Sequence, residues 1–209
     1  MTASAFQSIL YPTDFSDSSI PAFAHALRIA VGAKSELHAK THSCDFIVMM
    51  THARTGFARW MYGSIASETE RRSRLPTLYL RRGSNGFVDR ETGLVSLKRV
   101  LTPVDPAIPP LAARRLVEAL ALALQCPVEI RPLSVGRRVD LGGDWPPVDM
   151  RQGFIVDAIV GYAGEIDADL IVMPTAGRRG LFDALSGSTT ERVLIGADRP
   201  VLAVPTAET

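Results

Sequence analysis

One stretch of this chain is a near copy of another. Residues 45–80, DFIVMMTHARTGFARWMYGSIASETERRSRLPTLYL, align without a gap to residues 169–204, DLIVMPTAGRRGLFDALSGSTTERVLIGADRPVLAV. The offset is 124 (169 minus 45), and 11 of the 36 positions are identical. Upstream, ILYPTDF at residues 9–15 corresponds to VLTPVDP at residues 100–106, where the offset is only 91 (100 minus 9). The chain is therefore expected to hold two copies of one structural unit, with the first copy 33 residues shorter (124 minus 91).

Each copy alternates apolar strands with amphipathic helices, which predicts an α/β fold built on parallel strands. In the second copy, a strand at residues 98–104 precedes a helix whose buried face repeats every four residues, at Leu116, Leu120 and Leu124. A strand at 128–133, a loop at 136–147 and a helix at about 153–166 follow. The unbroken apolar runs LIVMP and PVLAV are typical of strands buried on both faces of a sheet.

The first copy departs from this order. Its helix is predicted to end at Gly32 and to carry an apolar face made of Phe23, Leu27, Ala30 and Val31. If ELHA at 36–39 and DFIVMM at 45–50 were neighbouring parallel strands, five residues would have to make a crossover that normally takes about 10 to 12. We therefore expect the segment around residue 38 to be loop or helix extension, and the first copy to be a three-stranded half-domain.

These boundaries divide the chain into a truncated first domain at 1–83, a linker at 84–97 and a second domain at 98–209. The 23 Lys and Arg balance the 22 Asp and Glu, so nothing favours nucleic acid or an acidic membrane surface as a partner. The N-terminal sequence lacks the pattern of a signal peptide, and no window is apolar enough to span a bilayer, so we expect a cytoplasmic protein.

The motifs resemble the universal stress protein family in its tandem two-domain form. The resemblance rests on ILYPTDFSDSS near the start, on DFIVMMTHARTG followed by YGS, and on DLIVMPTAGRRG followed by SGSTTERVL and PVLAV. It implies flavodoxin-like sheets of the adenine nucleotide alpha hydrolase type, with two tandem copies, the first reduced. Family members often bind ATP and pair through their last strands.

The family's nucleotide loop is usually Gly, two residues, Gly, nine residues, Gly, then Ser or Thr. The matching positions in the second copy are Pro174, Gly177, Gly187 and Ser188, with Thr189 next. Glycines let a phosphate approach the backbone, and the hydroxyls lie at the start of a helix. Pro174 has no amide hydrogen to donate. In the first copy the positions are Met50, Ala53, Gly63 and Ser64, and we predict no nucleotide there.

Each candidate residue also has a purely structural interpretation. Ser188 and Glu191 have the spacing of a helix capping box, which is a sufficient reason for SGSTTE in any protein. Asp14 and Asp105 each end a first strand, where α/β sheets bind ligands, and the resemblance places the matching Asp beside the adenine and ribose. Either could instead cap a helix or close a turn. Asp105 is the better candidate because it accompanies Gly177 and Gly187.

The sequence therefore predicts a stress-response regulatory protein whose second domain binds ATP or another adenine nucleotide. The alternative is a degenerate interaction or structural module that binds no nucleotide. We predict no enzyme, because no catalytic nucleophile or base is identified, and no metal site, because His38, His42 and Cys44 lack a fourth ligand. We also expect PTLYL at 76–80 and PVLAV at 200–204 to pair antiparallel between the copies, as in a fused dimer, and a homodimer is a further expectation.

Overall fold

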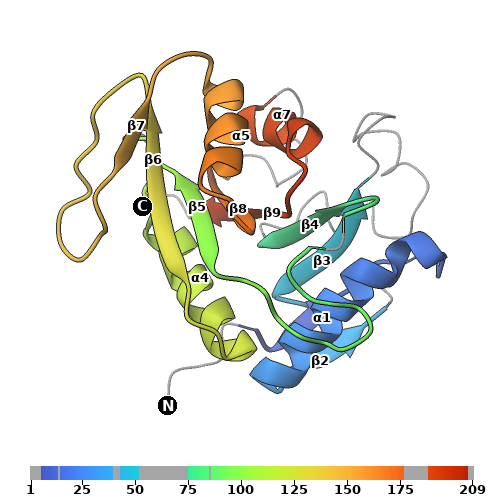
Figure 1. Cartoon of the computed structure of the whole chain (residues 1–209). Helices are drawn as coiled ribbons and strands as arrows, with labels where there is room; N and C mark the ends of the chain where they lie inside the picture. Colours follow the sequence, from blue (N-terminus) through green and yellow to red (C-terminus); the bar gives the residue numbers. More distant parts are fainter. Residues whose placement is uncertain are drawn as a thin grey trace.

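One sheet runs through the whole of the described chain (Figure 1). The computed structural model describes residues 6–13, 15–39, 43–51, 75–84, 86–176 and 188–206. The strands within these ranges are β1 (Ser8–Leu10), β2 (Glu36–His38), β3 (Phe46–Thr51), β4 (Thr77–Arg81), β5 (Arg99–Pro103), β6 (Glu129–Val135), β7 (Asp149–Arg151), β8 (Leu170–Ala176) and β9 (Val201–Thr206). The helices are η1 (Asp17–Ser19), α1 (Ile20–Ala33), α4 (Leu111–Leu124), α5 (Ile155–Glu165) and α7 (Thr189–Gly196).

The strand order is β2-β1-β3-β4-β9-β8-β5-β6-β7. Every neighbouring pair is parallel except β4 and β9, which are antiparallel with Leu78 opposite Leu202. The expected pairing of residues 76–80 with 200–204 is therefore present, and it joins the strands of the two halves into one continuous sheet. In this position neither β4 nor β9 has an edge open to solvent.

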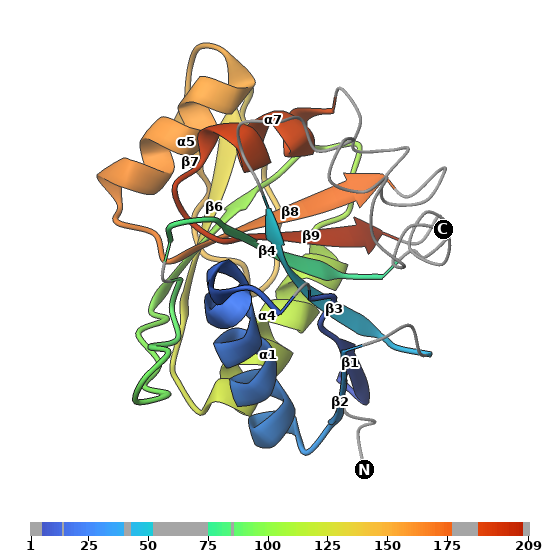
Figure 2. The same cartoon turned by 90° about the vertical axis from the view of Figure 1, so that its right-hand side faces the viewer.

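Helices cover both faces of the sheet, with α1 and α4 on one face and α5 and α7 on the other (Figure 2). Side chains of successive strand residues point to opposite faces, so each strand supplies both cores. In β8, for example, Val172 lies in the core beneath α1 and α4, whereas Ile171 and Met173 lie in the core beneath α5 and α7. This two-sided burial explains why LIVMP and PVLAV read as unbroken apolar runs.

The offset found in the sequence also relates the first helices of the two halves. Both α1 and α4 have 14 residues, and their bounds differ by 91 positions at each end (111 minus 20, and 124 minus 33). Both end at a residue in the left-handed conformation, Lys34 or Gln125, whose backbone N–H bonds to carbonyls of the last turn.

The expectation that residues 36–39 are loop or helix extension is wrong, because β2 is a strand at the edge of the sheet. It pairs with β1 rather than with β3, so the described strands of the first half number four and not three. The register explains how this is possible. His38 lies opposite Leu10, and Phe46 lies opposite the adjacent Ile9, so β2 ends level with the start of β3. The end of β2 and the start of β3 thus lie at nearly the same height of the sheet, on the two sides of β1.

The buried face predicted for α1 is also wrong. Phe23, Leu27 and Val31 are 43%, 42% and 66% exposed, and of the four predicted residues only Ala30 is buried. The buried face consists instead of Ala22, Ala26, Ile29 and Ala30, together with His25. The three alanines are small enough to let α1 approach the sheet and α4 closely. Gly32 does not end the helix: a Cβ at this position would lie 1.8 Å from the carbonyl oxygen of Ala123 in α4.

The second half contains two elements, β7 and α5, that have no counterpart among the described residues between β2 and β3. The predicted loop after β6 is followed by β7, an edge strand that the sequence did not suggest, and then by α5. Asp149 of β7 accepts hydrogen bonds from Arg131 of β6 and from Tyr162 of α5, so β7 is held to both elements. The chain then crosses to β8 on the other side of β5.

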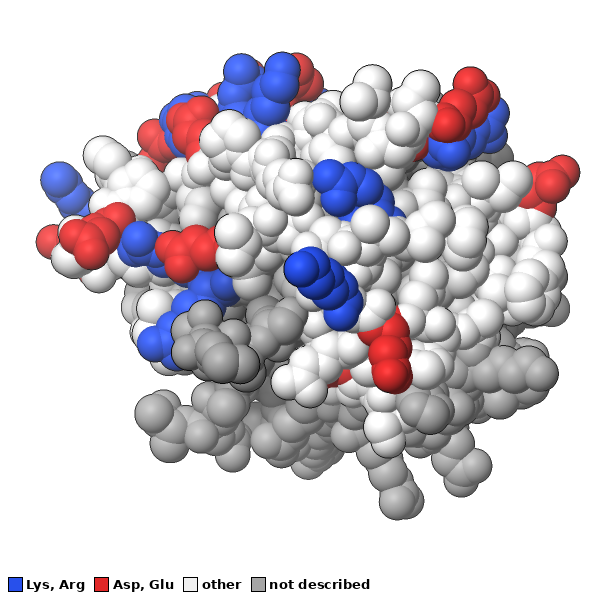
Figure 3. Space-filling model, turned by 90° about the horizontal axis from the view of Figure 1, so that it is seen from below, with Lys and Arg blue, Asp and Glu red and all other residues white. Residues whose placement is uncertain are grey.

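The surface agrees with the balanced composition. On the face seen in Figure 3, basic and acidic side chains are scattered among uncharged residues and form no field of one sign. Among the described helices, none has the length and apolar character needed to cross a bilayer.

Candidate functional site

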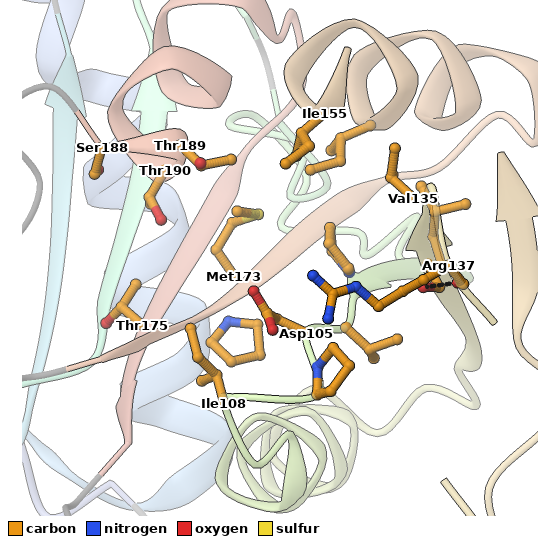
Figure 4. A pocket seen from close by; sticks show the side chains of 17 residues that line it. Asp105, Ile108, Val135, Arg137, Ile155, Met173, Thr175, Ser188, Thr189 and Thr190 are labelled. Atoms are coloured by element: carbon orange, nitrogen blue, oxygen red, sulfur yellow. Dashed lines mark hydrogen bonds between the residues drawn. The ribbon is translucent and has the colours of Figure 1, made fainter. Parts of the chain in front are cut away.

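A cavity of about 320 Å³ opens where β5, β6 and β8 end (Figure 4). After β5 the chain goes through α4 to β6 on one side, and it later returns through α5 to β8 on the other side. This reversal of strand order leaves a crevice at the carboxyl ends of the strands, which is where open α/β sheets bind ligands. The lining residues come from the segment after β5, the end of β6, the start and middle of α5, the end of β8 and the start of α7.

Asp105 projects into this cavity from the turn after β5. Its Oδ1 accepts a hydrogen bond from the backbone N–H of Ala107 at 2.9 Å, and its carbonyl oxygen accepts from the N–H of Ile108. One carboxylate oxygen of Asp105 is therefore used to close the turn, as the structural interpretation of this residue predicted. The other oxygen has no bond to any described residue, and Figure 4 shows the carboxylate over the middle of the cavity.

The start of α7 forms the opposite side of the cavity. Ser188 has extended backbone angles (φ −76°, ψ 165°), and its hydroxyl accepts a hydrogen bond from the N–H of Glu191 at 3.1 Å. The capping role predicted for Ser188 is thus real. The backbone N–H groups of Thr189 and Thr190 lie in the first turn of α7, where the helix itself offers no carbonyl acceptor. They bond to no described residue. Two free donors at the positive end of a helix are suited to an anion.

Apolar side chains make up the wall between these polar groups. Met173 and Ile159 are almost fully buried and Val135 and Ile155 are more exposed, and all four line the cavity. Pro174 lines it as well, opposite Val204 of β9. The pairing of β8 with β5 covers only Leu170 and Ile171, so Pro174 lies beyond that ladder, where its missing N–H costs no sheet hydrogen bond. A cavity with apolar walls and a few convergent polar groups is typical of a small-molecule site.

The structure thus brings four predicted residues, Asp105, Pro174, Ser188 and Thr189, to one cavity. Gly177 and Gly187 lie outside the described residues, so their predicted role stays a prediction. The same holds for the first copy: Met50 is buried in β3, whereas Asp14, Ala53, Gly63 and Ser64 lie outside the described ranges.

Sequence reasoning missed Arg137, whose guanidinium points into the cavity from the loop after β6 (Figure 4). It also missed Ser134, a buried residue whose hydroxyl donates to the carbonyl oxygen of Arg137 at 2.6 Å. One signal could have found Arg137: it comes two residues after a strand that ends at the same sheet edge as Asp105. In the described part of the chain, no three potential metal ligands lie together, and His42 falls outside it.

Comparisons with known proteins identify relatives of the chain. Residues 135–205 match the model of the universal stress protein family. Universal stress protein MJ0531 of Methanocaldococcus jannaschii is 46% identical over 56 residues, which are 27% of this chain and 33% of that protein. The chain therefore aligns with about a third of the length of this curated relative.

Solved structures resemble the chain over nearly its whole length. A universal stress protein from Archaeoglobus fulgidus DSM 4304 has a TM-score of 0.67 at 15% identity, covering 98% of each chain. A protein of unknown function from Pseudomonas aeruginosa PAO1 has a TM-score of 0.60 at 15% identity, covering 97% of this chain and 93% of its own. At this identity the likeness concerns the fold, which is the expected flavodoxin-like, nucleotide hydrolase-like α/β fold.

Proposed function

We propose that this chain, whose residues 135–205 match the universal stress protein family, is a stress-response regulatory protein that binds ATP or a related adenine nucleotide in the cavity at β5, β6 and β8. The observation that carries this proposal is the convergence on one cavity of the Asp105 carboxylate and the free N–H groups at the start of α7.

Each part of a nucleotide has a matching surface. The apolar wall around Met173 and Ile159 suits the flat, mostly apolar adenine ring. The free oxygen of Asp105 is an acceptor for a ribose hydroxyl. The N–H groups of Thr189 and Thr190 are donors for a phosphate. At about 320 Å³ the cavity is at the lower end of the usual range for ligand sites, so a nucleoside fills it and the phosphates lie at its α7 end.

The alternative function is an interaction or structural module without a nucleotide, and Pro174 favours it. This residue lines the cavity but has no amide hydrogen, so the backbone offers a ligand one donor fewer at the end of β8. Nucleotide binding must then depend on Asp105 and on the start of α7. A dissociation constant for ATP in the millimolar range would favour the alternative function.

Acid extraction of the purified protein, followed by nucleotide chromatography, tests the proposal directly. We expect an adenine nucleotide in the extract, and we expect ATP to raise the melting temperature of nucleotide-free protein. Finding no nucleotide and no thermal shift at millimolar ATP would reject binding and leave the interaction module. Binding without turnover is expected, and ADP released from ATP in excess of a protein-free control would contradict it.

Asp105→Ala is the variant that tests the site. Removing a charged acceptor costs about 1.5 to 3 kcal/mol of binding free energy, so ATP affinity should fall by roughly tenfold or more. Asp140→Ala is a matched control, because Asp140 makes a similar turn contact, accepting from the N–H of Gly142 at 2.9 Å, but does not line the cavity. Equal affinity in the two variants would show that Asp105 does not contact the ligand.

A further inference from the structure

The backbone around Arg137 is held in place on both sides. Preceding it, Gly136 has a φ of +78°, which turns the chain away from β6, and its N–H bonds to the carbonyl oxygen of Arg151 in β7 at 2.9 Å. The hydroxyl of Ser134, which is 1% exposed, donates to the carbonyl oxygen of Arg137 itself. The start of this loop is therefore fixed to the sheet at the point where Arg137 leaves it.

The guanidinium of Arg137 points into the cavity without a partner among the described residues. Within the described residues it forms no hydrogen bond and no ion pair, whereas Arg131, six residues earlier, bonds to Asp149 at 2.7 Å and to Tyr162 at 3.0 Å. Figure 4 shows the guanidinium inside the cavity on the side of Asp105, away from Ser188 and Thr189. A cation held over a cavity without a protein partner is available to an anionic group of a ligand.

The cavity consequently has two separate positions for an anion. One is the start of α7, where two backbone donors bond to no described residue, and the other is Arg137, next to the Asp105 carboxylate, whose second oxygen is available to a ribose hydroxyl. A ribose carries two adjacent oxygens, at its 2′ and 3′ positions. If one of these ribose oxygens carries the hydroxyl that donates to Asp105, a group attached to the other ribose oxygen is directed toward Arg137.

We propose that Arg137 makes this cavity selective for adenine nucleotides that carry a phosphate on the ribose 2′- or 3′-oxygen in addition to a 5′-phosphate. This inference rests on the proposed nucleotide site and specifies its ligand class. The 5′-phosphate lies at α7, the unmodified ribose hydroxyl donates to Asp105, and the added phosphate pairs with the planar guanidinium of Arg137. The positive charge of Arg137 also offsets the repulsion between this phosphate and the Asp105 carboxylate.

Calorimetric titrations with AMP, adenosine 2′,5′-bisphosphate and adenosine 3′,5′-bisphosphate test the proposal on the intact chain. We expect at least one bisphosphate to bind roughly tenfold more tightly than AMP, since a charge-assisted pair with phosphate is worth about one factor of ten. Because this part of the site is exposed, the preference should shrink as salt rises from about 50 mM to 500 mM. Equal binding of all three nucleotides would overturn the proposal, although AMP binding would still support the nucleotide site.

Arg137→Gln and Arg138→Gln form a matched pair for the same titrations. Both arginines are exposed in the same loop, but Arg138 does not line this cavity. We expect Arg137→Gln to lose the preference for a bisphosphate over AMP, and Arg138→Gln to keep this preference. A preference that survives in Arg137→Gln would overturn the role of Arg137. Failure of every nucleotide to bind the wild-type protein would instead reject the proposed function.

Discussion

The buried imidazole of His25 makes the stability of this protein depend on pH in a way that can be calculated. His25 lies in α1 with no exposed surface, and its Nδ1 donates to the carbonyl oxygen of Pro21 at 2.7 Å. Its Nε2 accepts from the backbone N–H groups of Phe87 and Val88 at 3.0 and 3.1 Å. A proton on Nε2 would replace both of these acceptor contacts with repulsion between donors.

Burial lowers the pKa of His25 from 6.5 to about 4, and the hydrogen bond to Pro21 opposes the effect only in part. Above pH 6.5 both the folded and the unfolded states are neutral. As the pH falls below 6.5, His25 is protonated in the unfolded chain but stays neutral in the folded protein. The free energy of unfolding therefore decreases until the pH reaches about 4. The full loss is about 3 kcal/mol, and about 2 kcal/mol of it is already present at pH 5.

Urea unfolding at pH 7.5 and pH 5.0, followed by circular dichroism, measures this loss. His25→Gln provides the comparison, because glutamine keeps polar atoms at the site but does not titrate. The wild-type free energy of unfolding should fall by about 2 kcal/mol more than that of the variant between these pH values. An equal fall in both proteins would refute the reasoning. An NMR titration of the wild-type imidazole gives a second check, and a folded-state pKa near 6.5 would refute it independently.

Two further predictions concern the helices. Gly32→Ala should destabilise the protein by about 2 kcal/mol or more in urea unfolding, because its Cβ would overlap the backbone oxygen of Ala123. Gly161→Ala in α5 meets no atom within 4 Å and should instead stabilise by about 0.5 to 1 kcal/mol, so an equal effect of both variants would contradict the packing argument. Ser188→Ala should cost about 1 kcal/mol through loss of the cap to Glu191, and Ser188→Gly only a few tenths, measured as shifts in the urea midpoint.

Local patterns in the sequence were enough to predict most elements and four of the residues that line the candidate cavity. The runs LIVMP and PVLAV are typical of strands buried on two faces, and a strand that ends near Asp105 delivers this residue to the carboxyl edge of the sheet. The cap at Ser188 followed from its spacing to Glu191. Each of these inferences depends on residues close together in the chain.

For Arg137 the sequence offered only its position two residues after a strand, because its importance depends on a neighbour 32 positions away (137 minus 105). An arginine in a loop rich in glycine and proline looks like any solvated side chain. Only the order of β6, β5 and β8 shows that this loop starts beside the turn that carries Asp105.

The sequence by itself determined the repeat, the α/β class and the shortness of the first half, because these follow from apolar periodicity and from the two offsets. The antiparallel pairing of β4 with β9 was expected from the family resemblance and the symmetry of a repeat. The tertiary structure alone decided that residues 36–38 form a strand and that α1 buries its alanines and leaves Phe23 exposed. Short segments and amphipathic faces have nearly balanced local preferences. Their conformation is set by which partner strand or helix is within reach, and that partner exists only in the folded chain.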